Sequence, residues 1–347
     1  MNSYLALVAP SHNRVYADRA PALMAAELRC VADALVPDGV MDVAPVEVAG
    51  VDYLGFETAT PLTGDPLRAV SALSGIQALY LREGDERGAL LRPVALERPD
   101  RFPSDLVTIL KYQGKTNEQF TRLLLTVTAM ATAWPERYLD GTMTVLDPMC
   151  GRGTTLSTAI TLGLDVTGID LDAKDLEAYQ AFLSTYLRQH RVKHKLTSGA
   201  IRRNGKTLGR RFDVELAADK DDYKAGRVQH VTYLGVDTTR LQGLLPAGQT
   251  NVIVTDTPYG VQHGSHGDRL ARSPLDLLDE ALPGWVRALR TGGAVGLAIN
   301  RHVAPRDDVT DLLGRHGLTV VDQGGYGGLR HRVDASIDRD IVVARKG

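Results

Sequence analysis

The apolar and polar positions along the chain predict two α/β units, one after the other. Within residues 1–100, short apolar runs typical of strands alternate with stretches of helical period. The expected strands are Tyr4–Val8, Val40–Val51 and Tyr53–Glu57, and the expected helices are Ala20–Leu35 and Leu67–Tyr80. Because this order is typical of a split βαβ, ferredoxin-like module, we expect residues 1–100 to form a small N-terminal α/β domain.

The second unit spans residues 105–347 and follows a Pro-rich linker at Pro93–Pro103. Strand-like runs recur there with helical stretches between them, which is the pattern of a parallel α/β sheet. The expected strands are Met143–Leu146, Leu164–Ile169, Gln229–Leu234, Asn251–Thr255, Ala294–Ile299, Leu318–Asp322 and Asp340–Ala344.

A Gly-rich turn follows the first strand of this unit. Val145–Thr155 has the sequence VLDPMCGRGTT, and Gly151 and Gly153 permit a tight turn in which a ligand lies against bare amides at a helix N-terminus. The next strand ends on Asp170, where an acidic side chain can accept hydrogen bonds from ribose hydroxyls. Turns of this kind also occur without a ligand, so a second motif is needed to decide.

That second motif is Asp256-Thr257-Pro258-Tyr259, at the end of the strand Asn251–Thr255. With these two motifs the chain resembles the class I S-adenosylmethionine-dependent methyltransferases. Within them it is similar to the amino-methylating group, whose fourth motif reads Asp/Asn/Ser-Pro-Pro-Tyr/Phe/Trp. The pair DPMCGRGTT and DTPYG looks closest to the tRNA guanine-N2 methyltransferase-like family. The chain departs from the motif at Thr257, where a proline is expected.

The resemblance implies a seven-stranded Rossmann-like class I methyltransferase domain over residues 105–347, with S-adenosylmethionine as cofactor and no metal. It gives residues 1–100 a substrate-positioning role, although a domain that only packs on the core is an open alternative. The residues implied to bind the cofactor are Asp147, Met149, Cys150, Gly151, Gly153, Thr154, Asp170, Leu171, Asp237, Thr238 and Thr116. The residues implied to act on the methyl acceptor are Asp256, Thr257, Pro258 and Tyr259. Asp237 is implied to accept from the adenine amino group, but an Asp at a strand end can also cap a helix.

The second motif suits methylation of an amine whose lone pair is delocalised into a π system. Two acceptors for the N–H bonds draw such a nitrogen toward tetrahedral geometry and aim its lone pair outward. Asp256 Oδ and the carbonyl of residue 257 are the expected acceptors, and the Tyr259 ring offers a surface for stacking. Without proline at position 257 the loop lacks a fixed φ, so we expect a looser site that is either active or repurposed.

Three further segments are weaker candidates. Thr116 and Gln119 have the spacing of a capping box. The resemblance implies that the residues just before that helix lie near the carboxylate of the cofactor, and a capped core helix with solvated lysines is the open alternative. Those residues are Lys111, Gln113 and Lys115. Val261–Arg272 is polar and Gly-rich and predicts a loop over the pocket. The resemblance suggests a second, substrate-facing loop, unless its residues are exposed turn residues. They are Tyr326, Arg330, His331 and Arg332.

Composition narrows the class of protein. The net charge is −2 and the pI about 6.5, so no global basic field indicates a nucleic-acid partner. The two cysteines, Cys30 and Cys150, argue against a disulfide scaffold and exclude a multi-cysteine zinc site. No apolar run has the length of a membrane span, and the N-terminus lacks the order of a signal peptide. We therefore expect a cytoplasmic protein.

A local basic insertion, at about residues 188–211, departs from this balance because it contains nine Lys and Arg and no Asp or Glu. We expect a short strand at Val192–Leu196, with turns at Gly199 and at Asn204-Gly205. The insertion is either a solvated surface, partly balanced by Asp219–Asp222, or a surface that binds phosphates. The candidate phosphate contacts are Arg191, Lys193, Lys195, Arg202 and Arg203.

The expected activity is therefore methyl transfer to an exocyclic amine, and the resemblance favours guanine N2 in tRNA or another structured RNA. A DNA adenine or cytosine, a protein glutamine and a small amine are open alternatives. A catalytically silent RNA-binding module is another, motivated by Thr257.

Overall fold

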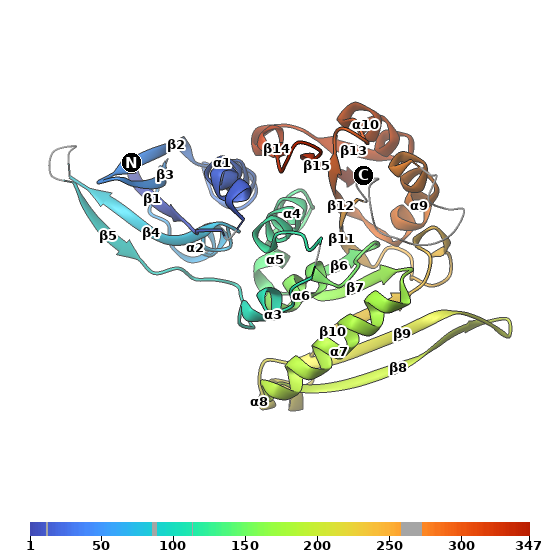
Figure 1. Ribbon diagram of the computed structural model, residues 1–347. Coiled ribbons are helices and arrows are strands. Elements are labelled where there is room, and N and C mark those ends of the chain that lie inside the picture. Colours follow the sequence, from blue (N-terminus) through green and yellow to red (C-terminus); the bar gives the residue numbers. More distant parts are fainter. Residues whose placement is uncertain (12, 85–88, 113, 258–272) are drawn as a thin grey trace.

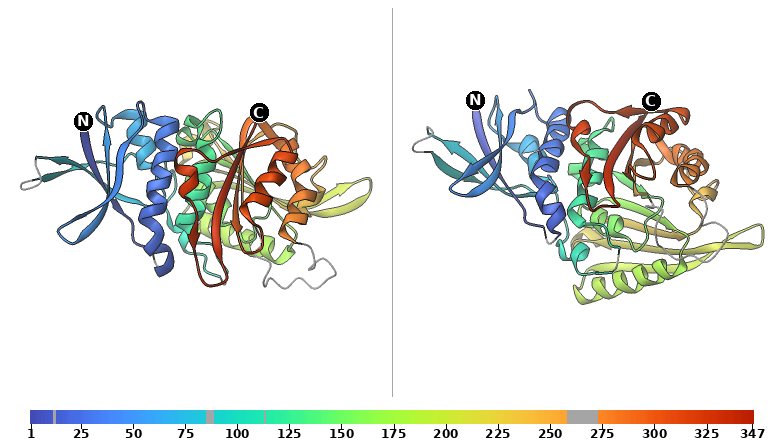
Figure 2. Two further views of the ribbon diagram at one scale, coloured as in Figure 1. Left: turned by 90° about the horizontal axis from the view of Figure 1, so that it is seen from above. Right: turned by 45° about the horizontal axis from the view of Figure 1, so that its top comes forward.

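The computed structural model describes residues 1–11, 13–84, 89–112, 114–257 and 273–347. Two β-sheets lie side by side, with helix α1 between them (Figure 1; Figure 2, left). No helix in these ranges is long and apolar enough to cross a membrane.

The N-terminal sheet has five antiparallel strands in the order β2-β3-β1-β4-β5. Its elements are β1 (Asn2–Val8), α1 (Arg14–Leu35), β2 (Met41–Val48), β3 (Val51–Thr58), α2 (Gly64–Ser71), β4 (Ile76–Glu83) and β5 (Leu90–Val94). Both helices pack on the face toward the second sheet (Figure 1). Up to β4, the order of elements and the antiparallel pairing are those of the predicted ferredoxin-like module.

Two expectations in this region are wrong. The expected helix Leu67–Tyr80 ends at Ser71, and its second half is the start of β4. Leu73, Ile76 and Leu79 follow one another at intervals of three and so mimic a helical face, although Leu79 pairs with β1. The expected linker begins within β5, whose Pro93 lies opposite Tyr80 on an edge strand, the place where a sheet tolerates proline.

The second sheet has ten strands in the order β13-β15-β12-β11-β6-β7-β10-β9-β8, with β14 paired to β15. Its strands are β6 (Thr144–Asp147), β7 (Asp165–Asp170), β8 (Lys193–Arg203), β9 (Lys206–Ala217), β10 (Gln229–Gly235), β11 (Thr250–Asp256), β12 (Leu289–Asn300), β13 (Leu318–Val321), β14 (His331–Arg332) and β15 (Asp338–Lys346). The helices are α3 (Asp105–Thr108), α4 (Glu118–Met130), α5 (Glu136–Asp140), α6 (Thr154–Thr161), α7 (Ala173–Gln189), α8 (Lys220–Lys224), η1 (Thr238–Arg240), α9 (Pro274–Ala288), α10 (Arg306–Arg315) and η2 (Gly324–Gly328).

The predicted seven-stranded Rossmann-like core is confirmed. Strands β10, β7, β6, β11 and β12 are parallel neighbours, and β15 is antiparallel between β12 and β13. The helices cover both faces, so Val145 packs in one core and its neighbour Leu146 in the other. The strands of this core are therefore apolar on both sides, which is why their positions were visible in the sequence.

The basic insertion is longer and more regular than expected. It contributes the hairpin β8–β9, which adds two strands beside β10 and projects from the body of the molecule (Figures 1 and 2). The expected turn at Gly199 is wrong, because Gly199 lies within β8 opposite Arg211. The expected turn at Asn204-Gly205 is confirmed, with φ of 51° and 75°.

Helix α1 joins the N-terminal domain to the second sheet through contacts with α4 and η2. The Tyr326 hydroxyl on η2 donates to the Val127 carbonyl on α4 at 3.0 Å, and Tyr326 is only 7% exposed. The expectation that Tyr326 faces substrate is therefore wrong. Its ring fills the contact with α1 because the short 3-10 helix η2, with two glycines on each side of Tyr326, brings it there rather than to the surface.

Candidate active site

The acidic ends of neighbouring parallel strands form the centre of the candidate site. Asp147 ends β6, Asp170 ends β7 and Asp256 ends β11, and Asp237 follows the end of β10. These four strands are adjacent in the order β10-β7-β6-β11 and run the same way. Their carboxyl ends therefore lie along one edge of the sheet, which is where open α/β sheets bind their ligands.

The Gly-rich turn between β6 and α6 is held against the end of β7. The Cys150 amide donates to the Ile169 carbonyl, and the Gly151 amide donates to Asp170 Oδ2, each at 2.9 Å. Gly153 has φ of +76° and caps α6, and a Cβ there would lie 2.5 Å from the Tyr179 ring. Only glycine fits this position, both for its backbone angle and for its contact with Tyr179.

Cys150 is buried within the turn, as a small residue that packs rather than reacts. Burial raises the pKa of its thiol well above the ordinary value, with the nearby Asp147 and Asp170 as further causes. A thiol of this kind is a poor nucleophile at neutral pH. The geometry therefore supports its expected place in the turn and assigns it no covalent chemistry.

Asp147 is a buried carboxyl group at the mouth of the turn, 3% exposed, and its Oδ1 accepts from the Met149 amide at 3.1 Å. Burial raises its pKa to about 7, and the hydrogen bond from Met149 limits the rise. A cation beside a buried carboxyl favours its ionised form. The side chain is thus suited to the positively charged ammonium group of S-adenosylmethionine.

Asp170 is held in place by two backbone amides. Its Oδ1 accepts from Asp172 and its Oδ2 from Gly151, each at 2.9 Å, and burial raises its pKa. A carboxylate fixed in this way keeps further lone pairs for ribose hydroxyls. The next residue, Leu171, is 61% exposed and offers an apolar surface beside it.

The structure divides the remaining candidates for the cofactor. Asp237 caps η1, because its Oδ1 accepts from the Thr239 amide at 3.0 Å, so the helix-capping alternative describes its local geometry. The Thr238 side chain points into the core and accepts from Trp285 Nε1 at 3.0 Å. Thr154 bonds to the Tyr112 hydroxyl at 2.9 Å. Tyr112 was missed in the sequence because nothing around it marks it as different from other aromatic residues.

Thr116 lies at Asp256 and not at a helix cap. Its hydroxyl donates to Asp256 Oδ2 at 2.7 Å. The N-cap of α4 is Asn117, whose side chain accepts from the Phe120 amide at 3.0 Å, so the expected capping box is wrong. Asparagine is as good a helix cap as threonine. Because the cap lies one residue later than expected, the Thr116 hydroxyl is available to Asp256 at the end of β11.

Thr257 follows Asp256 and is tied firmly to β12. Its amide donates to the Ala298 carbonyl at 2.9 Å and its hydroxyl donates to the same oxygen at 2.8 Å. Thr257 is 2% exposed. The expectation of a looser loop is therefore wrong at this residue, since the N–H that proline lacks is used here. Pro258 and Tyr259 lie outside the described residues, as do Gln113 and Val261–Arg272, so their roles stay predictions.

Arg339 is a further residue of the site that the sequence did not indicate. Its Nη2 lies 3.6 Å from Asp256 Oδ2, and its guanidinium carbon lies 4.5 Å from the centre of the Phe120 ring. Arg339 is 7% exposed. It is carried by β15, which pairs with β12 far from β11 in sequence, and no local pattern reveals such a contact.

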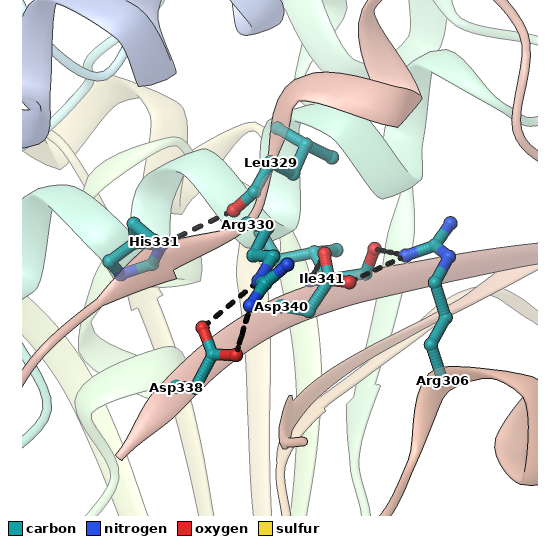
Figure 3. Close-up of polar contacts among 7 residues, drawn as sticks. All are labelled: Arg306, Leu329, Arg330, His331, Asp338, Asp340 and Ile341. Carbon is teal, nitrogen blue, oxygen red and sulfur yellow. Dashed lines mark hydrogen bonds and ion pairs between the residues drawn. The ribbon is translucent and has the colours of Figure 1, made fainter. Parts of the chain in front are cut away.

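The strand around Arg339 is fixed by its two acidic neighbours, as Figure 3 shows. Asp338 pairs with Arg330 at 2.8 Å, and Asp340 pairs with Arg306 of α10 at 3.1 Å. The buried His331 lies opposite Arg339 on β14, and burial lowers its pKa to about 4. His331 is therefore neutral at physiological pH, and it packs against Phe120. Its expected place on a substrate-facing loop is wrong.

One family model matches the part of the chain that carries the candidate site. The family described as the RMKL-like methyltransferase domain matches residues 137–302. No curated protein matches the chain.

Among solved structures, TrmN from Thermus thermophilus is 14% identical with a TM-score of 0.42, and the match covers 100% of both chains. A TehB-like SAM-dependent methyltransferase from Corynebacterium glutamicum is 15% identical with a TM-score of 0.34, covering 59% of this chain and 80% of that one. Magnesium protoporphyrin IX methyltransferase (ChlM) from Synechocystis, with bound SAM, is 14% identical with a TM-score of 0.37, covering 68% and 87%. Likenesses this distant say nothing about substrate.

The sheet order, the Gly-rich turn and the matched domain point to one conclusion. Asp147, Gly151, Gly153 and Asp170 lie together at the carboxyl edge of the parallel strands, and the family match spans all four. The chain is a class I S-adenosylmethionine-dependent methyltransferase, and its residues 137–302 match the RMKL-like methyltransferase domain.

Proposed function

We propose that this enzyme methylates an exocyclic amino group, guanine N2 in tRNA or in another structured RNA. The observation that carries the proposal is the carboxylate of Asp256, held at the end of β11 by the Thr116 hydroxyl and the Arg339 guanidinium. A methyltransferase that acts on a delocalised amine needs an acceptor fixed beside the nitrogen, and it needs little acid–base chemistry.

The residues of the chain divide this task. When bound, S-adenosylmethionine would supply an electrophilic methyl group, whose bond to the sulfonium sulfur would break as its bond to the amine nitrogen forms, so that a neutral thioether would leave. Asp256 accepts from one N–H of the amine and the carbonyl of Thr257 accepts from the other, so the lone pair is aimed outward. The two hydrogen bonds from Thr257 to the Ala298 carbonyl hold the residue that carries this acceptor against β12. Fixed acceptors of this kind account for up to about 7–11 kcal/mol of a barrier in the best intramolecular cases.

The position of the N-terminal domain favours a large substrate. Its residues contact the start of α4, beside Thr116. The Asn117 side chain donates to Ser11 Oγ at 3.1 Å, and Tyr16 lies edge-on to His331 with 6.2 Å between ring centres. We therefore propose that residues 1–100 position the substrate over Asp256.

The test is transfer of a labelled methyl group from S-adenosylmethionine to total tRNA, rRNA and DNA, followed by digestion to nucleosides and mass spectrometry. The proposal predicts label in N2-methylguanosine from the RNA. Label in DNA would replace the RNA substrate but keep the chemistry. A chain that binds tRNA and transfers no methyl group to any of these acceptors would instead be a silent RNA-binding module.

A further inference from the structure

The tip of the hairpin β8–β9 lies on the same edge of the sheet as the candidate active site. Strand β9 is antiparallel to β10, with Arg210 opposite Gly235, the last residue of β10. From Arg210 back to Lys206, the tip continues past the end of β10 by four residues, which span about 13 Å. It therefore projects beyond the edge at which β7 and β11 present Asp170 and Asp256 (Figure 1).

The tip is basic and its charges face solvent. Residues 200–209 include Arg202, Arg203 and Lys206 and contain no Asp or Glu. All three side chains are exposed, and within the described ranges none of them forms an ion pair. Three other cations of the hairpin form ion pairs: Lys195 with Glu215 at 4.0 Å, Arg210 with Glu177 of α7, and Arg211 with Asp213.

The tip is also held in one place. Asn204 and Gly205 both have positive φ, which is the type I′ geometry that matches the twist of a two-stranded ribbon. Arg203 Nη1 donates to the Gln242 carbonyl at 3.0 Å, in the segment that follows Asp237 and η1. Gly209 packs directly on Gly235 at the end of β10. The charges are thus braced against the loop beside the cofactor edge.

The structure separates the basic residues into two groups. In the strand register, Lys193 and Lys195 lie opposite Ala217 and Glu215 of β9, beside the start of β10. Arg191 comes just before β8. From Lys195 to Arg203 the strand runs eight residues, about 27 Å. Of the two groups, only the basic residues of the tip lie at the edge that carries the candidate active site. The basic insertion is therefore not one continuous surface.

We propose that the tip, Arg202–Lys206, binds backbone phosphates of the RNA whose amino group enters the site. This inference rests on the proposed function. The basic tip extends about 13 Å beyond the end of β10. A polyanion such as RNA is long enough to contact both the tip and the candidate active site, whereas a small amine is not. Arg202 and Lys206 are the phosphate-binding residues, and Arg203 braces the tip through Gln242.

The test compares two double variants of the full-length protein that remove the same charge. Arg202→Thr with Lys206→Thr alters the tip, and Lys193→Thr with Lys195→Thr alters the other end of the same strand pair. Binding of fluorescently labelled total tRNA is measured between about 50 and 200 mM salt, where each phosphate contact contributes roughly 0.7–0.9 to the slope of log affinity against log salt. Thermal melting and titration with S-adenosylmethionine show that both variants fold and hold the cofactor.

The proposal predicts that the tip variant lowers the slope by about 1.5, while the other variant keeps the wild-type slope. Equal slopes for the tip variant and the wild type, or an equal loss in both variants, would overturn the tip assignment. If tRNA is still methylated in that case, the proposed function stands. If the wild type neither binds nor methylates tRNA, both ideas fail together, and the labelled-methyl experiment identifies that outcome separately.

Discussion

Arg339 Nη2 lies 3.6 Å from Asp256 Oδ2, and this contact joins the two strands that flank β12. Arg339 is buried and packs over the Phe120 ring, so its charge is directed at the strand end and away from solvent. Thr116 donates to the same carboxylate oxygen. Two segments far apart in sequence, at Thr116 and at Arg339, thus hold the Asp256 carboxylate in place.

Replacing Arg339 should slow methyl transfer without weakening the cofactor complex. Arg339→Ala removes the cation that orients Asp256, and a displacement of about 1 Å at a reacting group can cost roughly 100-fold in rate. Arg339→Lys should recover part of the loss, because lysine keeps the charge without the planar fork. The matched control is Arg345→Ala, which removes an exposed arginine from the same strand. Steady-state kinetics would contradict this role if Arg339→Ala and Arg345→Ala were equally active.

Restoring the family's proline should harm this protein. Thr257→Pro removes the amide and the hydroxyl that both donate to Ala298 O, and it leaves a buried carbonyl without them. Thr257→Val removes only the hydroxyl bond. We expect a loss of about 1 kcal/mol in the free energy of unfolding for the valine variant and about 1–3 kcal/mol more for proline. Urea denaturation measures both, and a proline variant as stable as the wild type would show that the amide contributes nothing.

A methyl group at Gly153 should disturb the cofactor turn. In Gly153→Ala the new Cβ would lie 2.5 Å from the Tyr179 ring, at a φ of +76°. Gly226→Ala is the control for backbone strain alone, because Gly226 has φ of +72° and nothing within 4 Å of its Cβ position. Strain should cost each variant about 1–2 kcal/mol, and overpacking should cost Gly153→Ala about 1–3 kcal/mol more. Differential scanning calorimetry compares the two, and equal melting temperatures would rule out the contact with Tyr179.

Cofactor binding should depend on pH through Asp147. Burial raises the pKa of this carboxyl to about 7 in the free protein, and a cationic ligand beside it should lower that pKa. Binding then releases a proton below pH 7, so affinity should fall as the pH drops from about 7 toward 5, by at most tenfold per pH unit. Calorimetric titration in two buffers of different ionisation enthalpy counts the protons. Absence of proton release at pH 6 would mean that Asp147 does not face the cation.

The stability of the cofactor-free protein should depend on pH in the opposite direction, again through Asp147. Without cofactor, the protonated form of Asp147 is favoured in the folded protein and the ionised form in the unfolded chain. Stability therefore declines as the pH rises from the unfolded pKa of about 4 to about 7, and it is level above that. Asp147→Asn should remove this part of the pH dependence in the same denaturation measurement.

The core of the second sheet could be predicted from the sequence because each of its signals lies within one short segment of the chain. Strands β6, β7, β10 and β11 are short runs rich in apolar residues that end on or just before acidic residues, and the Gly-rich turn lies between β6 and β7. Local periodicity also misled, since residues spaced by three in Leu67–Tyr80 belong partly to β4.

What remained hidden depends on pairing between distant segments. Arg339 meets Asp256 only because β15 returns beside β12, and Thr116 reaches the same carboxylate because Asn117 takes the cap. The extent of β8 was hidden because most of its side chains on both faces are exposed, so no apolar alternation marks it.

The central claim is that Asp256 binds the amine that is methylated and not the cofactor. It is tested most directly by titrating Asp256→Ala with S-adenosylmethionine in a calorimeter and measuring methyl transfer on the same preparation. The account predicts cofactor affinity within about twofold of the wild type together with a loss of transfer of roughly 100-fold or more, because the acceptor for the amine is gone while the cofactor edge is intact. Loss of cofactor binding with turnover retained would contradict it.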